Sequence, residues 1–210
     1  MQAQLNPGLI ARCRPARVIP VLTITDAKHA VPLAHALFDG GLTVLEITLR
    51  TPAALEAIKL IQAHGPGADV GAGTVLTSQH AEAAHKAGAR FLVSPGAAQR
   101  LLDAAESWPI PLLPGIATAS EAIAVLERGY RFAKFFPAES SGGIAALKAL
   151  AAPLADLVYC PTGGVGPSNL AAYLACPNVV CVGGSWVAPQ AMIDAGDWAG
   201  ITKLARAVHA

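Results

Sequence analysis

The chain has 210 residues, of which 53% are apolar and 14% charged, and its formal net charge is +1. This length suits one domain with a sizeable core, and so much apolar surface favours a sheet covered on both faces or an oligomer. With no basic run, the chain gives no reason to expect nucleic acid or an anionic membrane as a partner.

The cysteines and the start of the chain bear on the compartment. Cys13, Cys160, Cys176 and Cys181 form no CxxC pair and no zinc-ligand spacing, and three of them lie in apolar segments, as buried free thiols do. Residues 1–7 lack the order of a signal peptide, and no apolar run approaches the ~20 residues of a membrane helix. We expect a cytoplasmic protein in a reducing environment.

One pattern repeats along the chain after a predicted N-terminal helix that ends near Arg14-Pro15: a short apolar run, then an Ala- and Leu-rich helical run. Eight runs are predicted to be strands: 18–24, 43–50, 69–75, 90–95, 110–116, 131–138, 157–162 and 179–184. Helices are predicted between them, at 27–38 and 53–64 for example, and Ser78 is predicted to cap the helix after the third strand.

Strands that alternate with helices indicate parallel βαβ units and an α/β fold. Eight units predict a (βα)₈ barrel of the TIM type, with an extra N-terminal helix and one domain over residues 1–210. An open doubly wound sheet is the alternative. The Gly71-Ala-Gly73 turn lacks the third glycine of a dinucleotide fingerprint and does not support it.

The sixth predicted strand carries a lysine, Lys134, at its centre. Alternation places Phe132, Lys134 and Phe136 on one face and the intervening residues on the other. Lysine is depleted from strands, and a desolvated amine is a nucleophile that forms a Schiff base with a carbonyl carbon. The alternative is an edge-strand lysine whose head group reaches water.

The second predicted strand places Glu46, Thr48 and Arg50 on the face opposite its leucines and isoleucine. The helices that cover the sheet need an apolar outer face of the sheet, so these polar side chains are expected inside. Buried there, they must form hydrogen bonds or ion pairs, or serve a function. Arg50, as the last strand residue, suits an anion at the barrel mouth. The structural alternative is a buried Glu46–Arg50 ion pair.

Glycines and prolines mark other strand ends. Gly71 and Gly73 precede Thr74, either to let a group approach the backbone or for tight packing. Pro95 either walls a pocket or only ends the fourth strand.

Two glycine pairs follow the seventh and eighth strands, in Thr162-Gly163-Gly164 and Gly183-Gly184-Ser185. Barrel enzymes commonly hold a phosphate there, on backbone N–H groups, and ordinary turn glycines are the alternative.

These candidates together suit imine chemistry on a 2-keto acid that carries a phosphate at its far end. Lys134 would be the nucleophile, Glu46 the general acid and base, and Arg50 the carboxylate ligand. The six histidines form no HxH or HxxxH pair, so we expect no metal site. We also expect no cofactor.

The chain resembles the 2-keto-3-deoxy-6-phosphogluconate (KDPG) aldolases, which include 4-hydroxy-2-oxoglutarate (KHG) aldolases, from about residue 15 to its end. The motifs that carry the resemblance are 45–51, 71–75, 94–96, 132–138, 161–164 and 183–186. The resemblance implies a class I aldolase on a (βα)₈ barrel, usually a homotrimer, in the Entner–Doudoroff pathway of carbohydrate metabolism.

By position, the resemblance implies Lys134 as the Schiff-base lysine and Glu46 as the proton acceptor and donor. The implied substrate contacts are Arg50 and Thr74 at the pyruvate carboxylate, Pro95 and Phe136 in the pocket wall, Thr162 near the substrate hydroxyls, and Gly163, Gly164, Gly184 and Ser185 at the phosphate. Arg17, before the first strand, is a weaker candidate for a phosphate contact.

Three other functions stay open. A galactonate-derived substrate differs from the gluconate one at a single hydroxyl. A sugar-phosphate epimerase or isomerase could use Glu46 and the same phosphate loops without an imine. A binding protein could keep the phosphate site without chemistry, although the presence of Lys134 and Glu46 speaks against it.

Overall fold

Short parallel strands alternate with helices from residue 7 to residue 209, the part of the chain that the computed structural model describes. The predicted absence of a signal peptide concerns mainly residues 1–6. These residues lie outside the described residues.

The strands follow the predicted order but are shorter than predicted. They are β1 (Val18–Leu22), β2 (Val44–Thr48), β3 (Asp69–Gly73), β4 (Leu92–Val93), β5 (Leu112–Leu113), β6 (Gly115–Ile116), β7 (Phe132–Phe135), β8 (Val158–Pro161) and β9 (Val182–Gly184).

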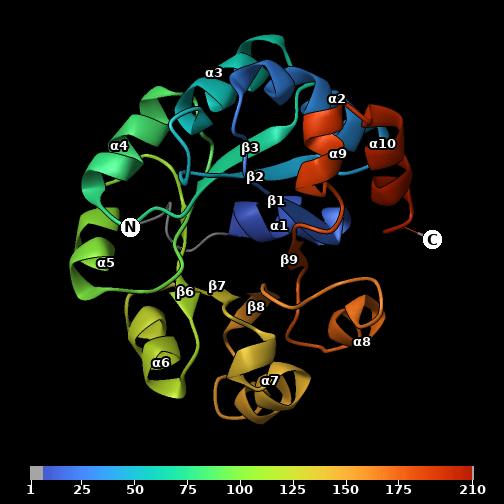
Figure 1. Ribbon diagram of the computed structural model, residues 1–210. Helices are drawn as coiled ribbons and strands as arrows, with labels where there is room; N and C mark the ends of the chain where they lie inside the picture. Colours follow the sequence, from blue (N-terminus) through green and yellow to red (C-terminus); the bar gives the residue numbers. More distant parts are fainter. Residues whose placement is uncertain (1–6, 210) are drawn as a thin grey trace.

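The helices surround these strands (Figure 1). They are α1 (Pro7–Ala16), η2 (Ala27–His29), α2 (Ala30–Asp39), α3 (Ala54–His64), α4 (Ser78–Lys86), α5 (Gln99–Ala105), α6 (Ala119–Glu127), η3 (Glu139–Ser141), α7 (Gly143–Ala151), α8 (Leu170–Leu174), α9 (Gln190–Ala195) and α10 (Trp198–Arg206), where η marks a 3₁₀ helix.

The parallel strands curl in two segments, ordered β5-β4-β3-β2-β1-β9 and β6-β7-β8. The run predicted as one strand at 110–116 is divided into β5 and β6, with Pro114 between them. Proline has no N–H to donate to a ladder, which explains the break. A parallel bridge between Thr162 and Gly183 links the two segments at the other side. The predicted α/β fold with a curled parallel sheet is confirmed.

One predicted helix cap is wrong. The N-cap of α4 is Thr77, whose hydroxyl group accepts a hydrogen bond from the backbone N–H of His80 at 3.2 Å, while Ser78 is the first helical residue. Both residues can cap, and Thr77 has the extended backbone that an N-cap requires.

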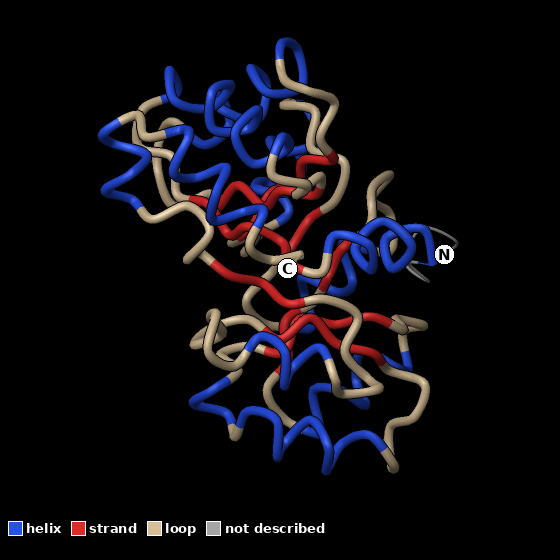
Figure 2. The backbone as a smooth tube through the Cα atoms, turned by 90° about the vertical axis from the view of Figure 1, so that its right-hand side faces the viewer, coloured by secondary structure: helices blue, strands red, loops and turns tan. Residues whose placement is uncertain are grey.

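The core lies on both sides of the sheet. Outward residues such as Leu45 and Ile47 of β2 pack in a large apolar cluster beneath the helices. Inward residues such as Phe132 of β7 pack with Leu9 and Cys13 of α1 in a second cluster. Figure 2 shows α1 at one end of the sheet, between the two groups of helices. The inner cluster therefore fills the space enclosed by the curled sheet, beneath α1.

All four cysteines are free and buried, whereas the sequence predicted burial for three of them. Within residues 7–209, no helix has the length and apolar character needed to cross a lipid bilayer.

Candidate active site

Lys134 and Glu46 form a buried pair inside the curled sheet. The lysine is 5% exposed and the glutamate 3%. Nζ of Lys134 donates to Oε1 of Glu46 at 3.2 Å and to Oε2 at 3.5 Å. Nζ also lies 5.3 Å from the ring centroid of Phe136, within cation–π range. A lysine that is sequestered in this way is available to the cavity above it and not to bulk water.

Alternation on β7 explains why Lys134 points inward. Phe132 belongs to the inner cluster, whereas Ala133 and Phe135 pack under the helices. The predicted face of Lys134 is confirmed, and the edge-strand alternative is wrong, because β7 is paired on both sides, with β6 and β8.

Glycines on β3 make room for side chains from neighbouring strands. A Cβ atom on Gly73 would overlap the carboxylate group of Glu46, and a Cβ atom on Gly71 would overlap the ring of Phe91. Gly71 therefore serves core packing. Gly73 lets Glu46 lie flat against β3, at the height of Lys134.

Arg50 lies at the mouth of the sheet and interacts with Thr74. Its Nε donates to Oγ1 of Thr74 at 3.1 Å. Strand β2 ends at Thr48, so Arg50 belongs to the turn that follows and is not the last strand residue as predicted. Among the described residues, Glu46 forms its ion pair with Lys134 and not with Arg50. The guanidinium group is left to face the cavity.

Thr74 holds a backbone conformation that is unusual for its type. Its φ is 59°, in the left-handed region that β-branched residues avoid. Strain of this kind costs about 1–3 kcal/mol and tends to occur at functional sites. The conformation follows directly after Gly73 and places the Thr74 hydroxyl against Arg50.

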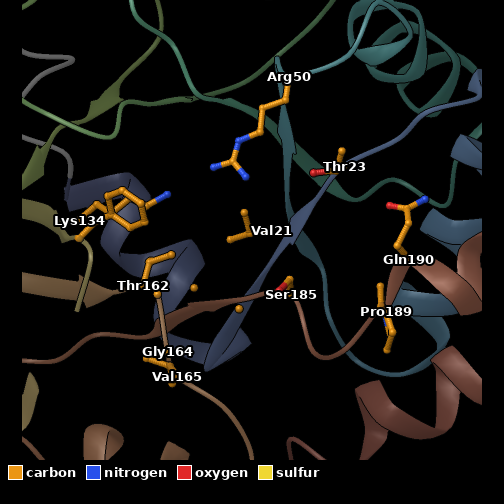
Figure 3. A pocket seen from close by; sticks show the side chains of 15 residues that line it. Val21, Thr23, Arg50, Lys134, Thr162, Gly164, Val165, Ser185, Pro189 and Gln190 are labelled. Atoms are coloured by element: carbon orange, nitrogen blue, oxygen red, sulfur yellow. The ribbon is translucent and has the colours of Figure 1, made fainter. Parts of the chain in front are cut away.

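A cavity of about 370 Å³ opens at the carboxyl ends of the strands (Figure 3). It contains Arg50, Lys134 and Phe136 together with the glycine pairs and Ser185. Its lining residues are Val21, Thr23, Arg50, Lys134, Phe136, Thr162, Gly163, Gly164, Val165, Gly183, Gly184, Ser185, Ala188, Pro189 and Gln190. Most of the predicted site residues thus converge on one cavity.

The two glycine pairs are glycines for different reasons. Gly163 and Gly164 have φ values of 98° and 81°, so their loop requires residues without a Cβ atom. Gly183 and Gly184 belong to β9, where a Cβ atom would overlap Thr162 and the Trp186 ring, respectively. Only the first pair is a turn, and both expose backbone to the cavity.

Polar side chains hold the Gly163-Gly164 loop from behind. Asn169 accepts from the N–H of Gly166 at 2.8 Å and donates to the carbonyl oxygen of Gly164 at 3.1 Å. The stem of Glu139 packs against Gly164, and its carboxylate accepts a hydrogen bond from the Tyr173 hydroxyl group. Burial and this hydrogen bond raise the pKa of Tyr173 above its ordinary value.

Four candidates are not lining residues of the cavity. Glu46 and Thr74 contact the lining residues Lys134 and Arg50, whereas Pro95 and Arg17 lie apart from the cavity. Pro95 follows β4, is half-buried, and has its carbonyl group against Gly115; it does not line the cavity. The carbonyl oxygen of Arg17 accepts from the N–H of Val182, where β1 and β9 begin. Arg17 is therefore at the opposite end of the strands from the cavity.

Thr23 and Gln190 line the cavity but were not predicted. Thr23 follows β1, and Val21 and Thr23 share the inward face by alternation. That signal was available in the sequence. Gln190 begins α9, and no strand pattern marks it.

The part of the chain that the structure describes holds no group of three or more His, Cys, Asp or Glu side chains that could bind a metal ion.

A buried Lys–Glu pair beneath a cavity at the strand ends of a curled parallel sheet is an arrangement suited to an enzyme of the α/β class that forms a Schiff base. The family model described as KDPG and KHG aldolase matches residues 9–204. The chain belongs to this family.

Known proteins are similar over nearly the whole chain. The 2-dehydro-3-deoxy-phosphogluconate aldolase of Pseudomonas aeruginosa is 53% identical over 92% of this chain and 88% of its own. The KDPG aldolase structure from Legionella pneumophila, with pyruvate captured at low pH as a covalent carbinolamine intermediate, has a TM-score of 0.93, 45% identity and 99% coverage of both chains. The Zymomonas mobilis ZM4 enzyme with 3-phosphoglycerate has a TM-score of 0.90 and 45% identity, over 98% of this chain and 96% of that one.

Proposed function

We propose that this protein is a class I aldolase that cleaves 2-dehydro-3-deoxy-6-phosphogluconate to pyruvate and glyceraldehyde 3-phosphate. It would also cleave 4-hydroxy-2-oxoglutarate to pyruvate and glyoxylate. The observation that carries the proposal is the buried Lys134–Glu46 pair, with Nζ 3.2 Å from Oε1, beneath a cavity that Lys134, Arg50 and Ser185 line.

In the proposed cycle, Nζ of Lys134 attacks the C2 ketone, and loss of water gives an iminium ion that can accept an electron pair. Glu46 takes the proton of the C4 hydroxyl group, the C3–C4 bond breaks, and glyceraldehyde 3-phosphate leaves. The resulting enamine is protonated at C3, and hydrolysis of the imine frees pyruvate and Lys134.

The remaining candidates bind the substrate in this proposal. Arg50, held by Thr74, binds the carboxylate group, and Phe136 shapes the pocket beside Lys134. Gly163, Gly164, Gly184 and Ser185 hold the phosphate, and Thr162 lies near the substrate hydroxyls. Pro95 would act only through the loop after β4, because it does not line the cavity.

We also propose that residues 1–210 form a single domain, with the sheet closed as a (βα)₈ barrel and α1 as an extra N-terminal helix. The Thr162–Gly183 bridge and the inner cluster with α1 support this architecture. The protein would be a cytoplasmic homotrimer without a bound cofactor. The family resemblance and the high apolar content support that assembly.

Borohydride reduction in the presence of pyruvate tests the proposal. Mass spectrometry should show one pyruvate adduct per chain on the peptide that contains Lys134. Lys134→Met should abolish the adduct, while Lys148→Met, at an exposed lysine of α7, should keep it. An epimerase or isomerase needs no imine, so a wild-type protein without an adduct would overturn the proposal.

A further inference from the structure

Thr23 lines the cavity, and none of the roles above uses it. It follows β1 directly and is half-buried. Figure 3 shows Thr23 between Arg50 and Gln190, on the opposite side of the cavity from Lys134. Arg50 marks the carboxylate end of the proposed substrate and Ser185 the phosphate end. In the proposed cycle Lys134 holds C2, so Thr23, across the cavity from Lys134, lies on the side that the distal carbons of the substrate would enter (Figure 3).

A hydrogen-bond chain fixes the direction of the Thr23 proton. Oγ1 of Thr48, which is fully buried, donates its single proton to the carbonyl oxygen of Leu22 at 2.9 Å. Oγ1 of Thr23 lies 3.2 Å from Oγ1 of Thr48. Because the Thr48 proton is already used, Thr23 must be the donor in this second hydrogen bond. Toward the cavity, the Thr23 oxygen can therefore act only as a hydrogen-bond acceptor.

A hydrogen-bond acceptor at this place selects among the groups of the substrate. Carboxylate and phosphate oxygens are acceptors themselves and gain nothing from a second acceptor. The hydroxyl groups of the substrate are donors. The C4 hydroxyl gives its proton to Glu46 in the proposed cycle, which leaves the C5 hydroxyl as the donor for Thr23.

We infer that Thr23 is a specificity-determining residue that accepts a hydrogen bond from the C5 hydroxyl group of the six-carbon substrate. This inference rests on the proposed function. A contact at C5 distinguishes the two proposed substrates, because C5 of 4-hydroxy-2-oxoglutarate is a carboxylate carbon that bears no hydroxyl group. A site built to bind a hydroxyl group discriminates against analogues that lack it.

Thr23→Val tests the inference, because valine has nearly the shape of threonine but no acceptor. We expect kcat/KM for the phosphorylated substrate to fall about tenfold, equivalent to about 1.4 kcal/mol. Cleavage of 4-hydroxy-2-oxoglutarate should change less than about twofold, a ratio that a general packing effect would not give. Thr23→Ser keeps the hydroxyl group and should retain most of the activity on both substrates.

A substrate analogue without the C5 hydroxyl group allows wild-type and Thr23→Val enzyme to be compared on two substrates that differ only in that group. Wild-type enzyme should cleave 2-keto-3,5-dideoxy-6-phosphogluconate about tenfold less efficiently than the natural substrate, whereas Thr23→Val should cleave the two compounds with similar kcat/KM. Equal losses on the natural substrate and the 5-deoxy analogue in Thr23→Val would overturn the inference.

Borohydride trapping of pyruvate separates this inference from the proposed function. Pyruvate would be bound to Lys134, across the cavity from Thr23 (Figure 3), so Thr23→Val should form the pyruvate adduct as wild type does. If wild-type protein forms no adduct and cleaves neither substrate, the proposed function itself fails. If the adduct forms but Thr23→Val cleaves the phosphorylated substrate at the wild-type rate, only the role of Thr23 fails.

Discussion

Nζ of Lys134 and Oε1 of Glu46 lie 3.2 Å apart, on strands that are 88 residues apart in the chain. Both side chains are buried, and Gly73 leaves the space in which the Glu46 carboxylate lies. The amine and the base of the proposed cycle are therefore held together before substrate enters.

Glu46→Gln separates proton transfer from imine formation. Glutamine keeps the shape and a hydrogen-bond acceptor for Lys134 but removes the base. General acid–base groups typically contribute ~10²–10⁴-fold, so we expect kcat to fall by about that factor while pyruvate trapping persists at a slower rate. Glu56→Gln, at a position on the outer helix α3, is the matched control. Turnover of Glu46→Gln near the wild-type rate would place the base elsewhere.

Thr74→Gly should relieve the backbone strain at this position and weaken substrate binding. Glycine adopts a φ of 59° without penalty, so we expect the free energy of unfolding to be unchanged or slightly higher, as chemical denaturation would measure. The variant also loses the hydroxyl that accepts from Arg50, so KM should rise for both substrates.

Thr74→Ser keeps the hydroxyl and serves as the control for that effect. If Thr74→Gly destabilised the protein and left KM unchanged, Thr74 would be a packing residue without a role at Arg50.

Ser185→Asp tests the phosphate site. Ser185 lines the cavity and is exposed, so solvent screens part of the repulsion between a carboxylate and the phosphate group. We expect kcat/KM for the phosphorylated substrate to fall at least about tenfold and that for 4-hydroxy-2-oxoglutarate to change little. Ser185→Asn has the same size without the charge and should show a much smaller loss. Equal losses on both substrates in folded Ser185→Asp would place the phosphate elsewhere.

Tyr173→Phe tests how the Gly163-Gly164 loop is held. Tyr173 donates to Glu139, whose stem packs on Gly164, so loss of the hydroxyl should loosen the loop. We expect a rise of a few-fold in KM for the phosphorylated substrate at nearly constant kcat, about the effect of one hydrogen bond. Tyr159→Phe is the matched control, because the buried Tyr159 hydroxyl has no hydrogen-bond partner within residues 7–209. Similar KM values in the two variants would contradict the role of Tyr173.

The same pair of variants predicts an effect of alkaline pH on stability. Burial raises the pKa of Tyr159 to about 12, and burial together with Glu139 raises the pKa of Tyr173. The folded protein therefore holds these protons longer than the unfolded chain. The free energy of unfolding should fall as pH rises above about 10, and each variant should reduce that fall. A steeper fall in either variant would contradict the assignment.

The sequence by itself determined which face of the strands Glu46 and Lys134 occupy. A period of two on the second and sixth predicted strands put Glu46 and Lys134 inside, because helices on the outer face demand apolar partners there. The same alternation on the first predicted strand places Thr23 inside, although Thr23 was not predicted as a site residue. Turn glycines at 163 and 164 were also readable, since their backbone needs positive φ.

Only the tertiary structure decided which of these groups interact. Alternation gives a face but no partner, so it could not tell that Glu46 pairs with Lys134 and that Arg50 pairs with Thr74. The partner depends on strand register and on the curl that brings β2 opposite β7, which are long-range packing effects. The direction of the Thr23 proton is also tertiary, since it depends on Thr48 of the neighbouring strand.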